Sequence, residues 1–121
     1  MTSNDFRDCA LALEGAVESS HMGHPDFRRG GKIFATLHYP DENWGMVKLS
    51  PEEQDDFVRS HSDAFVPVKG AWGRQGCTNV CLQKVNSEVL REALRLAWTK
   101  AVAPKPRPTV RKRASAKTPR V

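Results

Sequence analysis

The sequence predicts an α+β domain built on an antiparallel sheet. Two groups of strand-like segments, residues 17–49 and 65–82, are separated by a strongly marked helix start at Ser50. Helical patterns precede the first group and follow the second. Strand groups separated by helices are typical of α+β domains. The predicted order is therefore helix, three or four strands, helix, two strands, helix.

The first predicted helix covers residues 3–14. Thr2 or Ser3 can cap its N-terminus, and Asp5 is favourable in its first turn. Apolar residues at helical spacing mark the buried face: Phe6, Cys9, Ala10 and Leu13. We expect Gly15 to end the helix and Cys9 to pack as a small hydrophobe.

Residues 17–21 predict a short strand that residues 22–25 break. Residues 26–29 and 32–39 then predict a hairpin, because Gly30-Gly31 suits the positive φ of a two-residue turn. In its second arm, period-two alternation places four side chains on one face: Ile33, Ala35, Leu37 and Tyr39. After a turn at 40–43, residues 44–49 predict a strand with Val47 and Leu49 on one face. Trp44, Met46 and Lys48 lie on its other face.

The second helix start has the clearest local pattern. Ser50 is an N-cap, Pro51 takes the first helical position, and Glu53 completes a capping box, which predicts about ten helical residues. Its inward side chains are Phe57 and Val58. Residues 65–69 predict an edge or bulged strand, because Pro67 cannot donate to a ladder.

The last predicted elements are a strand at residues 78–82 and a helix that Ser87 caps. The buried stripe of that helix is Leu90, Ala93, Leu94, Ala97 and Trp98.

Two glycine-containing loops carry cations. The second basic loop (residues 66–76) has three glycines and displays Lys69, Trp72, Arg74 and Gln75. The alternative is a hairpin loop whose Trp72 folds back to cap the core. The first basic loop (residues 28–32) contains Arg28, Arg29 and Lys32 around Gly30-Gly31.

Charge divides the chain into two parts. Residues 104–121 contain seven of the 19 Lys and Arg residues and no acid, so residues 1–103 hold twelve cations against fourteen acids. We therefore expect an α+β domain over 1–103 and a disordered basic tail over 104–121. Three prolines, Pro104, Pro106 and Pro108, mark the boundary.

Composition excludes several classes of protein. The chain has 121 residues, which suits one modest core, and its apolar runs fall well short of the roughly 18 residues of a membrane span. Its first residues lack the pattern of a signal peptide. Three cysteines, at positions 9, 77 and 81, argue against a disulfide scaffold and for a reducing cytoplasm. We expect a cytoplasmic monomer that makes no membrane contact.

Catalytic and metal sites are not expected. The chain has no nucleophile elbow, phosphate-binding loop or paired catalytic carboxylates. His21 and His24, near Asp26, match no zinc spacing. Cys77 and Cys81 lie about 13 Å apart along a strand, too far for a disulfide or one zinc ion. We therefore predict a non-catalytic protein with no metal and no cofactor.

The chain resembles the MmcQ/YjbR family of small bacterial proteins through nearly all of residues 1–103. The matching motifs are Ser-Ser-His at 19–21, Gly-His-Pro-Asp-Phe-Arg at 23–28, Gly-Lys-Ile-Phe-Ala at 31–35, Trp44, Val-Lys-Leu at 47–49, and Gly-Ala-Trp-Gly-Arg-Gln-Gly-Cys-Thr-Asn at 70–79. The resemblance implies a frataxin-like (CyaY-like) fold with helices packed on one face of the sheet. It also implies DNA binding through two wing-like elements.

The hypothesis is therefore a DNA-binding protein with weak or no sequence specificity. Loop cations would contact phosphates, Trp72 would stack, Gln75 would contact a base edge, and the tail would add affinity by counterion release. The candidate residues are Arg28, Arg29, Lys32, Lys48, Lys69, Trp72, Arg74, Gln75, Arg111, Lys112 and Arg113. The alternative is a protein-interaction or small-ligand module that uses an apolar patch of Trp44, Met46 and Lys48 near Trp72.

Overall fold

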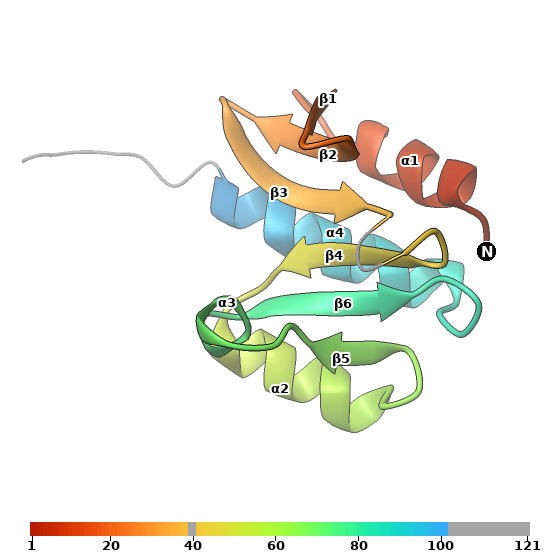
Figure 1. The fold of residues 1–121 in the computed structure, drawn as a ribbon, viewed down its shortest axis with the longest axis vertical. Coiled ribbons are helices and arrows are strands. Elements are labelled where there is room, and N and C mark those ends of the chain that lie inside the picture. Colours follow the sequence, from red (N-terminus) through yellow and green to blue (C-terminus); the bar gives the residue numbers. More distant parts are fainter. Residues whose placement is uncertain (39–40, 102–121) are drawn as a thin grey trace, which may run out of the picture.

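The computed structural model describes residues 1–38 and 41–101, which form six strands and four helices. In chain order they are α1 (Ser3–Leu11), β1 (Val17–His21), β2 (His24–Arg29), β3 (Lys32–Leu37), β4 (Trp44–Lys48), α2 (Pro51–Ser60), β5 (Phe65–Pro67), α3 (Ala71–Arg74), β6 (Cys77–Cys81) and α4 (Ser87–Ala101) (Figure 1). The α+β class is confirmed. The short helix α3 was not predicted. Four predictions concern residues outside the described part: the strand position of Tyr39, the turn at Pro40, the tail, and the roles of Arg111, Lys112 and Arg113.

The sheet is antiparallel throughout and has the order β1-β2-β3-β4-β6-β5. Strand β5 lies at one edge, as Pro67 predicted, and β1 lies at the other. The hairpin across Gly30-Gly31 is confirmed, with φ values of 59° and 81° and with Arg29 opposite Lys32.

Strand pairing brings both basic loops to the same end of the sheet. The first basic loop joins β2 to β3, and β4 ends beside it because it runs antiparallel to β3. Lys48 at the end of β4 faces Cys77, where β6 begins, and Pro67 faces Thr78. The second basic loop therefore leaves and re-enters the sheet at this end, only a few strand spacings of about 4.8 Å from the first. We call this the basic end of the sheet.

One hydrophobic core joins the sheet to the helices. One face of the sheet carries fully buried side chains, such as Leu37, Val47 and Val80. They form a cluster with α1 (Phe6, Ala10), α2 (Phe57) and the predicted stripe of α4. Figure 1 shows α4 crossing behind β3 and β4. Trp98, predicted as part of the buried stripe, is only partly buried.

The predicted alternation along β3 was wrong at its start. Phe27 pairs with Ala35, but Arg28 pairs with Ile33, so Phe34 is an extra residue in a β-bulge. Phe34 and Ala35 are both fully buried in the core. The bulge shifts the parity of the strand, and Ile33 turns to the opposite face from Ala35 and Leu37.

Four predictions of where elements begin or end were also wrong. Asn86 rather than Ser87 caps α4, because Asn86 Oδ1 accepts from Val89 N–H at 2.9 Å. Helix α1 ends at Leu11 rather than residue 14, because Leu13 N–H bonds the Ala10 carbonyl in a tighter turn. Residues 22–25 do not break the sheet; Met22 (φ 51°) and Gly23 (φ 82°) form a hairpin turn, and β2 begins at His24. Strand β5 ends at Pro67 rather than residue 69, because the chain then enters the second basic loop.

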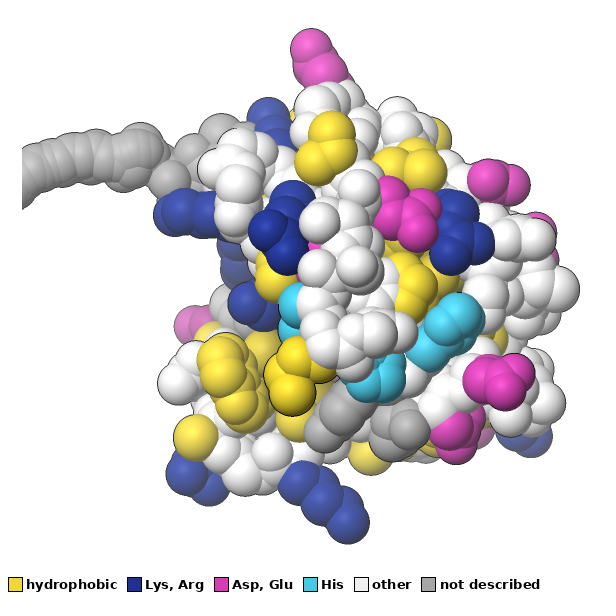
Figure 2. All heavy atoms as spheres, turned by 45° about the horizontal axis from the view of Figure 1, so that its top comes forward, with side chains coloured by type: hydrophobic (Ala, Val, Ile, Leu, Met, Phe, Trp, Pro, Cys, Tyr) yellow, Lys and Arg dark blue, Asp and Glu magenta, His cyan; other side chains and the backbone are white. Residues whose placement is uncertain are grey.

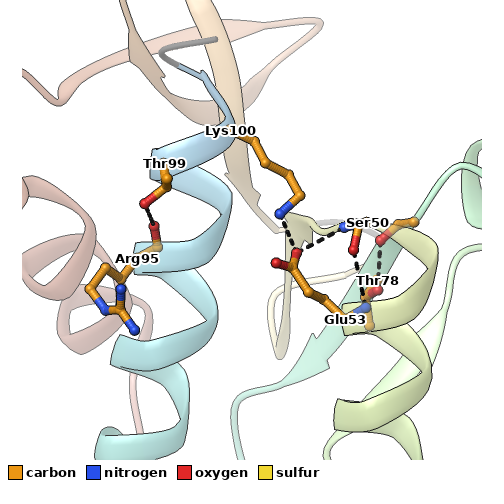
Figure 3. A network of polar contacts seen from close by, with 7 residues as sticks. Ser50, Glu53, Thr78, Arg95, Thr99 and Lys100 are labelled. Carbon is orange, nitrogen blue, oxygen red and sulfur yellow. Dashed lines mark hydrogen bonds and ion pairs between the residues drawn. The ribbon is translucent and has the colours of Figure 1, made fainter.

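The predicted capping box of α2 is confirmed and has a further partner. Ser50 Oγ accepts from Glu53 N–H at 3.1 Å, and Glu53 Oε1 accepts from Ser50 N–H at 3.0 Å. Lys100 of α4 makes an ion pair with the same carboxylate (Figure 3). Burial alone would raise the pKa of Glu53, but Lys100 and Ser50 together lower it. This carboxylate therefore ties the start of α2 to the end of α4.

Candidate functional site

The second basic loop is a compact structure held by backbone contacts. Val68 N–H bonds the Cys77 carbonyl, Leu49 N–H bonds the Gly76 carbonyl, and Gln54 of α2 donates to the carbonyls of Gly73 and Cys77. A Cβ at Gly73 would lie 1.6 Å from the Val68 oxygen, and one at Gly76 (φ 112°) would lie 1.9 Å from the Leu49 oxygen. Only glycine fits such close approaches, so the loop fixes the position of α3.

Helix α3 presents Trp72 to solvent. The Trp72 side chain is 61% exposed, so it does not fold back into the core. Lys48 Nζ lies 5.7 Å from the centroid of its ring, within the range of a cation–π contact. Lys69, Arg74 and Gln75 are exposed, and neither of the two cations forms an ion pair with any residue in 1–38 or 41–101. The display of side chains predicted for this loop is therefore present.

In the first basic loop, Arg28 is held by a buried acid. Asp26 is fully buried, and Arg28 approaches it with two nitrogens, Nε at 2.8 Å and Nη2 at 3.0 Å. His21 Nδ1 of β1 lies 2.7 Å from the same carboxylate. The hydrogen bond from Arg28 is the main cause of the lowered pKa of Asp26, and the contact with His21 lowers it further. Burial acts in the opposite direction and raises the pKa, but its effect is smaller than the two together. This network links β1 to β2.

The next arginine of that loop is also engaged inside the molecule. The Arg29 guanidinium carbon lies 3.6 Å from the centroid of the Trp98 ring, and Nη1 donates to the Trp98 carbonyl at 3.1 Å. Trp98 in turn donates from Nε1 to the Glu14 carbonyl at 2.7 Å. Arg29 therefore anchors α4 and the segment after α1. Lys32 is the loop's exposed cation.

A groove of about 480 Å³ lies on the sheet face opposite the core. We call it the sheet groove; its lining is His21, Met22, His24, Ile33, Thr36, Met46, Lys48, Val68, Trp72 and Cys77. Met22, at the tip of the β1–β2 hairpin, is 92% exposed. Figure 2 shows hydrophobic side chains gathered beside histidines, with Lys and Arg side chains around them. None of the described lining residues is an acid.

A second hollow, of about 450 Å³, adjoins the groove at the basic end. We call it the lysine cleft, because Lys32, Lys48 and Lys100 line it with Gly31, Ile33, Leu49, Ala97 and Ala101. Ile33 and Lys48 belong to both linings, so the two hollows are contiguous. Glu53 neutralises Lys100, which leaves Lys32 and Lys48 as the cleft's unpaired cations in the described chain.

The structure brings some predicted site residues together and separates others. Lys48 and Trp72 line the sheet groove, and Lys32 lines the adjoining cleft. Lys69 and Arg74 are exposed in the same loop as Trp72 but line neither hollow. Arg28 and Arg29 instead make internal contacts. Trp44 of the predicted apolar patch does not line the groove, whereas Met46 and Lys48 do.

Met22, Ile33 and Val68 line the groove but were not among the predicted site residues. Met22 could have been found, because an apolar residue at the tip of a turn indicates an exposed contact. Ile33 could not, because the face it occupies depends on the β-bulge, which was not predicted.

The lining of the groove includes the Cys77 thiol. Cys77 is buried, and burial raises the pKa of its thiol, so it stays protonated and a poor nucleophile at neutral pH. In residues 1–38 and 41–101, no group of three or more His, Cys, Asp or Glu residues is placed to hold a metal ion. The helices in this part of the chain are too short or too polar to cross a membrane.

Comparison with known proteins identifies the family. The crystal structure of Deinococcus radiodurans protein DR2400, which has a DUF419 domain, superposes with a TM-score of 0.67. The two chains are 20% identical, and the match covers 80% of this chain and 75% of the other. No curated protein sequence matches the chain. Residues 11–100 match the family model described as YjbR. The matched residues include every element from β1 to β6 and nearly all of α4. The protein therefore belongs to the YjbR family, as its motifs predicted.

Proposed function

We propose that the protein is a non-catalytic DNA-binding protein whose folded body binds through the second basic loop. The observation that carries this proposal is an exposed tryptophan with Lys48 Nζ 5.7 Å from its ring and two exposed cations, Lys69 and Arg74, in the same loop. Such a set suits a nucleic acid, because the cations can contact phosphates while the ring stacks on a base or sugar. Lys32 in the lysine cleft extends the same basic surface.

The acidic charge of the body does not prevent this mode of binding. The acids of α2 cluster on its exposed side, where Asp55 and Asp56 pair with Arg59. At the basic end, Asp26 is buried and paired with Arg28, and Glu53 is paired with Lys100. Glu52 remains an exposed acid at the start of α2. The local potential near Trp72 is therefore more positive than the average charge suggests.

The tail has a separate role in the proposal. Its seven cations, including Arg111, Lys112 and Arg113, would add affinity that is independent of sequence and falls steeply with salt. We also propose a frataxin-like arrangement with the long helices on one face of the sheet, which the single core supports. A monomeric protein in a reducing cytoplasm fits the three free cysteines.

The experiment measures binding of a short fluorescent DNA to the full chain by anisotropy. Arg111, Lys112 and Arg113 are changed to Gln in every sample, so that the tail contributes less. In this background we compare Lys69→Glu with Arg74→Glu against a control of equal charge change, Lys84→Glu with Arg95→Glu. The control residues are exposed and form no ion pair with described residues.

The loop variant should weaken binding at least tenfold and lower the salt slope by roughly two, about 0.9 for each lost phosphate contact. The control should lose much less. Equal losses in both variants, or no binding once these three tail charges are removed, would contradict a DNA-binding role of the body.

A protein-interaction role is the second candidate. The exposure of Met22 and Trp72 beside Met46 favours it, because methionine and aromatic side chains are typical of adaptable protein-binding surfaces. If the protein has this role, its DNA binding should be lost when the tail is removed. A protein partner should then bind with an affinity that does not depend on salt.

A further inference from the structure

We infer that the sheet groove takes up an unpaired nucleobase, so that the protein prefers single-stranded nucleic acid to duplex. The inference rests on the proposed function and names the form of its ligand. Trp72 and Met22 leave much apolar surface in water at the rim of one hollow. Exposed apolar surface of this kind marks binding sites, and a volume of about 480 Å³ suits a small planar group.

The shape of the groove selects an unpaired base. Its floor includes Thr36 and Met46 from the interior strands β3 and β4, so it is recessed between the hairpin tip of Met22 and helix α3. A base inside a duplex is stacked on both faces, and it must leave the stack before a protein ring can replace a neighbour. An unpaired base can stack on Trp72 without that cost.

The charges around the groove match a nucleotide. Its described lining contains Lys48 and two histidines but no acid, and Asp26 nearby is neutralised by Arg28. Lys69 and Arg74 lie in the same loop as Trp72, three residues before it and two after it. A base on Trp72 would therefore have cations near its own phosphates.

The lysine cleft gives the phosphate backbone a path away from the groove. It is contiguous with the groove through Ile33 and Lys48, and its other unpaired cation in the described chain is Lys32. A strand whose base enters the groove would run over Lys48 towards Lys32. This places the adjoining nucleotide against positive charge and a glycine backbone at Gly31.

A peptide fits the groove less well. Peptides that bind sheets usually add a strand at an edge and use its main-chain groups. The floor strands β3 and β4 have neighbours on both sides, so their main-chain groups are engaged in the sheet. The groove thus offers side chains and charge rather than an open ladder.

The test uses the full chain with Arg111, Lys112 and Arg113 changed to Gln and three labelled DNA probes. These are an oligothymidylate, the same length of abasic strand, and a duplex of equal length. Trp72→Ala is compared with Trp72→Phe, which keeps an aromatic face. Val17→Ala is the matched control, because Val17 is an exposed apolar residue outside the groove lining and outside both basic loops. Urea unfolding checks that each variant folds.

We expect the oligothymidylate to bind more tightly than the duplex or the abasic strand. Trp72→Ala should weaken its binding about tenfold, within the range for loss of one base–aromatic stack. Trp72→Phe should retain most of the affinity, Val17→Ala should change little, and binding of the abasic strand should not depend on Trp72.

Other outcomes overturn the inference in distinguishable ways. If the duplex binds as well as the single strand and Trp72→Ala has no effect, the body binds phosphates alone and only the proposed function survives. If none of the three probes binds, both fail. If an acidic peptide rich in leucine binds in a Trp72-dependent manner and no probe does, the groove is a protein site.

Discussion

The two basic loops have similar compositions, yet the structure gives their cations different partners. In the first, Arg28 bonds the buried Asp26 and Arg29 stacks on Trp98, so both charges hold elements together. In the second, Lys69 and Arg74 point to solvent from a loop that is fixed by its backbone. A cation close to glycine is therefore available to a ligand only when it does not already contact an acid or an aromatic ring within the protein.

Gly30 of the first loop also differs from Gly73 and Gly76 of the second, in the space around each glycine. Gly30 has open space where a Cβ would be, and its positive φ serves a simple turn. Gly73 and Gly76 leave no space, because carbonyls of Val68 and Leu49 occupy it. Gly30 can thus change without disturbing the fold greatly, whereas Gly73 and Gly76 are built into the junction of β4 and α2.

The largest expected effect is on Gly76. Gly76→Ala should lower the free energy of unfolding by about 3 kcal/mol or more, because positive φ and a close carbonyl both oppose the new methyl group. Gly30→Ala is the matched control and should cost only about 1–2 kcal/mol, the cost of positive φ alone. Urea unfolding measures both. Equal losses would show that the second loop is as open as the first.

A second prediction concerns the acid that engages the first loop. Asp26→Asn should lower stability at pH 7 by about 2–3 kcal/mol, because Arg28 loses its buried partner. Asp55→Asn, which affects an exposed pair with Arg59, should cost less than about 1 kcal/mol.

The same pair predicts a pH dependence. The folded protein lowers the pKa of Asp26, so its stabilisation is present above the unfolded value of about 3.9 and is lost as pH falls through the folded value. The stability of Asp26→Asn should therefore fall less steeply below about pH 4 than that of the unchanged protein. Urea unfolding at several pH values measures the free energy of unfolding of both proteins. An equally steep fall with decreasing pH in both would contradict the role given to Asp26.

The smallest expected effect separates a structural cation of the first loop from a binding cation of the second. Arg29→Gln should lower stability by about 1 kcal/mol through the lost stack on Trp98. It should leave DNA affinity almost unchanged, whereas Lys69→Gln should weaken DNA binding and leave stability unchanged. Unfolding and anisotropy on both variants give the comparison, and a binding defect in folded Arg29→Gln would contradict it.

Much of the fold could be predicted, because local chemistry determined it. The capping box at Ser50, the Gly30-Gly31 turn and the stripe of α4 are decided by residues close in sequence, and each is confirmed except for Trp98 in the stripe, which is only partly buried. The bulge at Phe34 could not be predicted, because it depends on the pairing of β2 with β3. Helix α3 likewise depends on Gln54 and Leu49, which are distant in sequence.

The candidate site was predictable only in its composition. The sequence located Trp72, Lys69 and Arg74 in one loop, and their exposure is confirmed. It could not reveal that Arg29 meets Trp98, since those residues are 69 positions apart. The sheet groove combines six segments of the chain, from the β1–β2 hairpin to the start of β6, and its formation required the strand order.

Binding through the second basic loop and the sheet groove is tested most directly by mapping amide chemical shifts during titration with an oligothymidylate. The protein is the full chain with Arg111, Lys112 and Arg113 changed to Gln. We expect the shift changes to concentrate at Met22, Lys48 and residues 68–76, with little change at Arg28 and Arg29. Shifts confined to the tail, or centred on the first basic loop, would contradict the claim that the second loop and the sheet groove form the binding surface.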